Sequence, residues 1–195
     1  MDNIESTAVP DYEIQTIINR FGFIYVKGMR FKNPNKPYAF TVGNNLYGFP
    51  VGTIYVSELA FRLFTPEELE WVVLHELAHI ANNDIPAKNF LEIVSVGGAA
   101  LLASLFEISF PLAALFVAFL RTLSTRRTGG ITARQELLAD QIATATQGVK
   151  DHGLSVLRKL LGNNIDIISH FTTGFVFKVP ALTIRERINA ILRDP

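Results

Sequence analysis

The residues His75-Glu76-Leu77-Ala78-His79 form the most informative pattern in this chain of 195 residues. Side chains at positions i and i+4 of a helix lie on one face, so the two imidazoles point toward a common centre. Two imidazole nitrogens at about 2.0–2.1 Å are typical first ligands of a zinc ion. Glu76 then lies beside the metal, where its carboxylate can take a proton from zinc-bound water. The alternative is an accidental spacing, which is rare in a chain with only 4 histidines.

The residues before this motif predict the helix that it requires. Thr65 is a typical N-cap, Pro66 suits the first helical position, and Glu68 completes a capping box. Apolar residues then recur at helical spacing, and we expect the helix to end near Asn82. These apolar residues are Leu69, Val72, Val73, Leu77 and Ile80.

A second predicted helix, residues 132–146, carries a candidate third ligand. Glu136 and Asp140 are four residues apart and therefore share a helix face. Glu136 can complete a set of two histidines and one glutamate, which leaves the fourth position open for water as in catalytic zinc sites. Asp140 can accept a hydrogen bond from the far nitrogen of a ligand histidine, most simply His75, and so fix its tautomer. The alternative is that both acids lie on a solvated face.

These motifs together resemble a known family. Residues 75–84, a following apolar segment and then Glu136-Leu-Leu-Ala139-Asp140 are similar to the HtpX-type and CAAX-prenyl-endopeptidase family of gluzincin zinc metalloproteases. The lead-in to the motif fits as well, and the resemblance covers roughly residues 35–145. It implies a zinc endopeptidase, and we expect one Zn²⁺ per chain.

The resemblance also assigns the site residues. It implies that His75, His79 and Glu136 are the metal ligands and that Glu76 is the general base. The family's late His-Pro-Thr motif has lost its His and Pro here, at residues 181–188, where the Arg is retained as Arg187.

The missing late histidine leaves the tetrahedral intermediate without a donor that the family commonly supplies. Candidates for that role are His170 and Tyr38; the alternative readings are a surface histidine and a strand tyrosine. Arg187 is a candidate for either a substrate contact or a structural ion pair.

Composition narrows the function classes. The 18 basic and 18 acidic residues balance, which gives no argument for nucleic acid as a partner. The absence of cysteine excludes disulfides and thiolate zinc sites. At this length we expect a single zinc metalloprotease domain over residues 1–195.

The apolar segment at residues 93–120 contains a single charge, Glu107. Such a run normally predicts a transmembrane helix. However, the candidate ligands lie on both sides of it in the sequence and must meet one ion, so the chain has to enter and return. Pro111 disfavours helix at the residue before it, which places the reversal at residues 106–111. We therefore predict an apolar helical hairpin over about residues 86–123, inserted between the two ligand helices.

The hairpin predicts an association with the membrane. Its arms are about 31 and 20 Å long at about 1.5 Å per residue, which fits a dip into one leaflet better than two crossings of about 30 Å. Arginines follow it without an intervening acid, which suits anionic headgroups and places the active site on the cytoplasmic side. The alternative is a soluble cytoplasmic protein whose hairpin is buried in the core or in an oligomer interface. These arginines are Arg121, Arg126, Arg127 and Arg134.

Around this insertion the predicted fold class is α+β, mostly helical and gluzincin-like, with a small antiparallel sheet. Strands are expected at residues 23–27, 38–42 and 53–57, the last two separated by Gly43, Gly48 and Gly52. Further helices are expected at residues 12–20, at 154–161 and from Thr183 onward. In gluzincins an edge strand holds the extended polypeptide substrate, and here either 38–42 or 53–57 is a candidate.

The function predicted from the sequence is peptide-bond hydrolysis by zinc-activated water, with Glu76 as the base. The alternative is a latent or inactive homologue that acts as a membrane or partner-binding module. The missing late histidine favours this alternative, whereas the intact ligand set and Glu76 argue against it.

Overall fold

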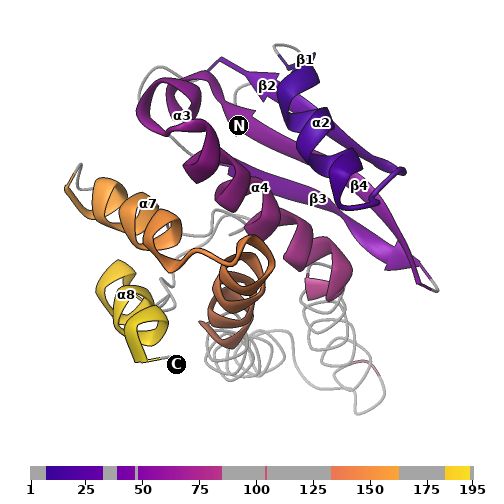
Figure 1. Ribbon diagram of the computed structural model, residues 1–195. Helices are drawn as coiled ribbons and strands as arrows, with labels where there is room; N and C mark the ends of the chain where they lie inside the picture. Colours follow the sequence, from indigo (N-terminus) through magenta and orange to yellow (C-terminus); the bar gives the residue numbers. More distant parts are fainter. Residues whose placement is uncertain are drawn as a thin grey trace.

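A four-stranded sheet and the helices packed against it form the ordered framework of the computed structural model (Figure 1). The structure describes residues 8–32, 39–46, 48–84, 104, 133–162 and 183–193. The strands are β1 (Val9–Pro10), β2 (Val26–Phe31), β3 (Ala39–Leu46) and β4 (Phe49–Ser57). Their order in the sheet is β1-β2-β4-β3. The α+β fold class is therefore confirmed.

The sheet is mixed, and the prediction of an antiparallel sheet was wrong in this respect. β2 pairs with β4 in parallel, while β1–β2 and β3–β4 are antiparallel. The chain passes from β2 to the outer edge, forms β3 there and returns through a hairpin. Two reversals of direction leave β4 parallel to β2 and between its two neighbours.

Two of the three glycines expected to separate the strands lie inside them. Gly43 and Gly52 face each other across the β3–β4 pair. A Cβ atom on Gly43 would lie 2.4 Å from the Val51 carbonyl oxygen, so only glycine fits this close approach. Gly48 alone lies at the turn of the hairpin, where its φ of 89° favours glycine. The strands are consequently longer than the predicted 38–42 and 53–57.

The helices predicted outside the hairpin are present, and local hydrogen bonds set the ends of α2 and α4. α2 (Tyr12–Arg20) is capped by Asp11, and α4 (Pro66–Ala81) has the predicted Thr65 cap with Glu68 completing the capping box. Residues 133–147 are helical, as predicted. α7 (Lys150–Gly162) and α8 (Ile184–Arg193) follow, and α3 (Glu58–Leu63) is a short helix that the sequence patterns did not predict.

Helix α4 is buried around most of its circumference. It packs on the sheet face formed by β3 and β4, while α7 covers another side, as Figure 1 shows. Ten of its 16 residues are buried, among them His75 and Glu76. Its side chains Trp71, Val73 and Leu77 belong to the same hydrophobic core as Ile54 of β4 and Leu157 of α7. The packing of apolar α4 side chains against the sheet on one side and α7 on the other therefore keeps His75 and Glu76 in the interior.

The predicted apolar hairpin lies outside the described residues, apart from Ser104. It therefore stays a prediction. Within the part of the chain that the structure describes, no helix has the length and apolar character needed to cross a membrane.

Glu68 joins the start of α4 to α7. Its carboxylate accepts hydrogen bonds from the Thr65 backbone N–H at 2.8 Å, from the Ser155 hydroxyl at 2.5 Å and from the Lys159 ammonium at 2.6 Å. Burial alone would raise the pKa of Glu68, but these donors outweigh it and hold the pKa below its ordinary value of 4.5. A lowered folded-state pKa means that ionised Glu68 stabilises the fold above about pH 4.5 and that this stabilisation is lost as the pH falls further.

We predict that Glu68→Gln lowers the free energy of unfolding at pH 7 by about 1.5–3 kcal/mol, the usual range for hydrogen bonds to a charged group. The deficit should shrink as the pH falls below about 4.5, because the wild-type carboxylate is then being protonated. Urea denaturation of both proteins at several pH values measures it. Glu13→Gln, at an exposed acid of α2, is the control and should change stability little. A deficit that stays constant with pH would contradict the role assigned to the charge.

Candidate metal site

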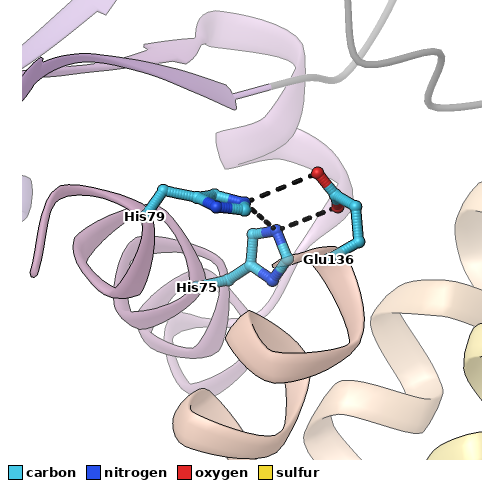
Figure 2. A group of neighbouring side chains, drawn as sticks. All are labelled: His75, His79 and Glu136. Atoms are coloured by element: carbon cyan, nitrogen blue, oxygen red, sulfur yellow. Dashed lines mark hydrogen bonds and ion pairs between the residues drawn. The ribbon is translucent and has the colours of Figure 1, made fainter. Parts of the chain in front are cut away.

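Three side chains from two helices meet near the C-terminal end of α4. His75 and His79 project from α4, and Glu136 projects toward them from the helix at residues 133–147 (Figure 2). The two Nε2 atoms are 3.2 Å apart. Glu136 Oε2 lies 3.4 Å from His75 Nε2, and Glu136 Oε1 lies 3.5 Å from His79 Nε2. The sequence spacing thus brings together the three residues expected to do so, and one ligand atom from each lies within 4.8 Å of the others.

These distances fit a zinc ion. Ligand atoms at about 2.0–2.1 Å in a tetrahedral arrangement are separated from one another by roughly 3.3–3.4 Å. The two Nε2 atoms are separated by 3.2 Å, and each lies 3.4 or 3.5 Å from a different carboxylate oxygen of Glu136. The three side chains therefore lie close enough together to bind one such ion, which leaves a fourth position for water or substrate.

Each imidazole has a carboxylate at its other nitrogen. His75 Nδ1 lies 2.9 Å from Asp140 Oδ1, and His79 Nδ1 lies 2.7 Å from Asp84 Oδ2. An ionised carboxylate only accepts hydrogen bonds, so the hydrogen bond between Asp84 and His79 places the ring proton on Nδ1, and the Asp140 carboxylate beside His75 Nδ1 favours the same tautomer. Both Nε2 atoms then present lone pairs to Glu136. Acceptors that converge in a buried space require a cation between them, or a proton.

The pKa of His75 reflects this requirement. Burial of the imidazole lowers its pKa, but the contacts with Asp140 and Glu136 outweigh the burial and raise the pKa to about 10. For Glu136 the effects have the opposite sign. Burial alone would raise the pKa of its carboxyl group, but His75 and Arg187 hold that pKa well below its ordinary value. The acids that raise the pKa of His75 in this way are electrostatically suited to hold a divalent cation as well.

Arg187 of α8 is buried beside these acids, with 3% of its surface exposed. Its Nε and Nη2 atoms donate to the two oxygens of Asp140 at 2.7 and 2.6 Å, and Nη1 lies 3.2 Å from Glu136 Oε2. Of the two roles weighed for Arg187, the structure places it as an ion pair. It holds Asp140 against His75 and Glu136 toward the ligand cluster, and it lowers the pKa of the buried Asp140 despite the opposing effect of burial.

Glu76 follows His75 on α4 and is also buried, with 8% of its surface exposed. Burial raises the pKa of its carboxyl group, although the charges of His75 and His79 act in the opposite direction. A carboxylate whose pKa is raised above its ordinary value is a better proton acceptor than one in water.

The sequence reasoning missed two residues that orient the histidines. Asp84 lies five residues beyond His79, where Asn83 turns the chain with a φ of 57° just after the helix ends. Trp71 stacks on His75 with 5.6 Å between ring centroids, and its Nε1 donates to Thr144 Oγ1 at 3.1 Å. The signal for Trp71 was available, since it precedes His75 by four residues on the same helix.

Two further candidates, His170 and Tyr38, lie outside the described residues. Their proposed contacts with substrate stay predictions.

Comparison with protein families gives one match that spans nearly the whole chain. The family model for peptidase family M48 matches residues 13–192. The chain belongs to peptidase family M48. The resemblance to HtpX-type proteases is thereby confirmed, and the chain is a zinc-dependent metallopeptidase, a hydrolase, at the level of the family. A search of curated proteins finds no match.

We predict that Asp140→Asn weakens zinc binding by about 10–100-fold, the usual loss when a partner of a ligand histidine is changed. The amide is uncharged, so it stabilises the His75 N–H less and loses the paired contact with Arg187. Competition with a chromophoric chelator measures the affinity, and circular dichroism verifies the fold. Asp151→Asn, at an exposed acid of α7, is the control. An affinity equal to that of the wild type would show that Asp140 does not support the site.

Proposed function

We propose that this M48 family member is an endopeptidase that hydrolyses peptide bonds with one zinc ion per chain. The observation that carries the proposal is the convergence of two histidine Nε2 atoms and the Glu136 carboxylate beside buried Glu76. His75, His79 and Glu136 would hold the metal. When bound, zinc lowers the pKa of a water molecule toward about 7 and polarises the peptide carbonyl.

The protein's own residues supply the proton transfers. Glu76 accepts the proton of the attacking water and then passes it to the amine that leaves. Its burial supports this role, because burial raises the pKa of the carboxyl group and so makes the carboxylate a stronger proton acceptor. Asp140 and Asp84 keep the two histidines in the tautomer that directs Nε2 toward the metal.

We propose that an extended polypeptide binds along β3. Within the described sheet β3 lies at the edge, whereas β4 pairs with β2 on one side and β3 on the other. The strand at residues 53–57 therefore has no free edge, and that alternative for the substrate strand was wrong. β3 packs beside α4, so a strand added at its free edge would run close to the metal ligands.

We further propose, from the sequence alone, that the chain associates with a membrane through the hairpin at about residues 86–123. The support is the apolar run at residues 93–120, the arginines after it and the need for both flanks to reach one metal site. The active site would then lie on the cytoplasmic side. A soluble cytoplasmic protein with the hairpin in an oligomer interface is the competing arrangement.

We predict that Glu76→Gln retains one zinc per chain but loses proteolysis, whereas His79→Ala and Glu136→Ala lose the metal as well. The reason is that Glu76 moves a proton and the other two residues bind the ion. Elemental analysis beside a casein-type assay separates the two effects, and Glu67→Gln serves as the active control. Loss of zinc from Glu76→Gln would overturn the assignment. A zinc-loaded wild type that cleaves neither unfolded nor membrane substrates would instead identify a latent homologue.

We also predict the accessibility of the hairpin. Because this chain has no cysteine, Asn89→Cys, Ser109→Cys and Ser124→Cys each create a unique thiol. In sealed vesicles the two flanks should react alike with an impermeant thiol reagent, and the thiol at position 109 should be shielded. Opposite labelling of the two flanks would rule out the hairpin. Equal labelling at all three positions in a protein released by carbonate would establish the soluble arrangement.

A further inference from the structure

The end of β3 is joined to the end of α4 by a set of amide hydrogen bonds. The Asn45 backbone N–H donates to the Asn83 side-chain oxygen, and the Asn83 side-chain amide donates to the Asn45 carbonyl at 2.9 Å. The Asn45 side chain in turn donates to the Ala81 carbonyl at 2.9 Å, at the last turn of α4. The carboxamide of Asn83 thus pairs with the backbone of Asn45 as the peptide group of a neighbouring strand would.

This pairing fixes which backbone groups of β3 face away from the sheet. Both backbone groups of Asn45 point to Asn83 and therefore away from β4, where its partner Pro50 has no N–H to donate. Backbone groups of an antiparallel strand alternate in direction, and the register of β3 with β4 runs without a bulge from residue 39 to residue 46. The N–H and C=O groups of Thr41 and Gly43 consequently also face away from β4, toward the outer edge of β3, where Gly43 is half-buried and Thr41 is 5% exposed.

We propose that Asn83 and Asn45 form a clamp that closes one end of the free edge of β3. A bound peptide pairs with Thr41 and Gly43 and stops before Asn45, because the backbone N–H and C=O of Asn45 are already hydrogen-bonded to the Asn83 side chain. This inference rests on the proposed peptidase function, and it defines how far the substrate extends on one side of the scissile bond. Asn83 is a positioning residue and does not itself touch the reacting atoms.

The position of Asn83 in the chain supports this role. Its φ of 57° lies in the left-handed region, which asparagine tolerates better than most residues, and it directs the carboxamide at β3 immediately after the helix ends. The next residue, Asp84, contacts His79 at 2.7 Å. The clamp therefore joins the end of β3 to the segment whose Asp84 orients His79. In this way it sets the register of a peptide bound along β3 relative to the metal site.

Amide hydrogen exchange tests the clamp without any turnover. The inactive Glu76→Gln protein, loaded with zinc, is compared with Glu76→Gln/Asn83→Gly. Glycine keeps the left-handed backbone and removes only the carboxamide, so the fold should hold. We expect Asn45 N–H to be protected in the first protein and to exchange at least about tenfold faster in the second. An equal exchange rate of the Asn45 amide in the two proteins would overturn the clamp.

Addition of an unstructured peptide to the same two proteins locates the end of the binding edge. With Asn83 present, the peptide should protect the Thr41 and Gly43 amides and leave Asn45 unchanged. In Glu76→Gln/Asn83→Gly, the peptide should also protect the Asn45 amide. Protection of Asn45 by peptide in both proteins, or protection that never reaches Thr41 and Gly43 in either, would overturn the proposal.

A series of quenched fluorescent peptides, lengthened one residue at a time at each end, provides the kinetic test. For the wild type, kcat/KM should stop rising early on one side of the scissile bond. In Asn83→Gly the same extension should lower KM about 2–10-fold with little change in kcat, as one further backbone hydrogen bond would. Asn19→Ala, which removes an exposed amide of α2, is the control and should keep the wild-type profile. Identical profiles for wild type and Asn83→Gly would refute the end stop, whereas absence of turnover in the wild type would refute only the proposed function.

Discussion

The site depends on a charged contact in the interior: Asp140 lies between the Nδ1 atom of His75 and the guanidinium of Arg187. A buried carboxylate is stable only where cations or donors surround it, and here one oxygen contacts both partners while the second receives Nε of Arg187. The contact fixes the His75 tautomer. It also ties α8 to the helix at residues 133–147 and, through His75, to α4. Without it, three helices would lose their common polar centre.

The second constraint is the burial of α4 between the sheet and α7. Because apolar side chains of this helix face both neighbours, the residues between them are held away from water whatever their polarity. His75 and Glu76 are buried for this reason. Burial raises the pKa of Glu76, whereas at His75 it lowers the pKa and is outweighed by the contacts with Asp140 and Glu136. The same packing that stabilises the helix therefore also adjusts the acid–base chemistry of the motif.

What could be predicted from the sequence is mainly what local geometry determines. The capping box at Thr65 and Glu68, the shared face of His75 and His79, and that of Glu136 and Asp140 follow from spacings of three or four residues. The parallel pairing of β2 with β4 could not be predicted in this way, because it depends on where the β3–β4 hairpin inserts. Arg187 lies 47 residues from Asp140 and Asn83 lies 38 from Asn45, so no periodicity connects them. The ligands and Asp140 are thus predictable from pattern, whereas the contacts that Arg187 and Asn83 make depend on how distant segments pack.

The central claim is that two imidazoles and one carboxylate surround a single tetrahedral zinc ion. X-ray absorption at the zinc edge, on wild-type protein that contains one equivalent of zinc, tests it most directly. The account predicts four nitrogen or oxygen ligands at about 2.0–2.2 Å with the outer-shell scattering of two imidazoles, and one imidazole fewer in His79→Ala if any zinc remains bound. A six-coordinate spectrum, or a spectrum without imidazole scattering, would contradict the account.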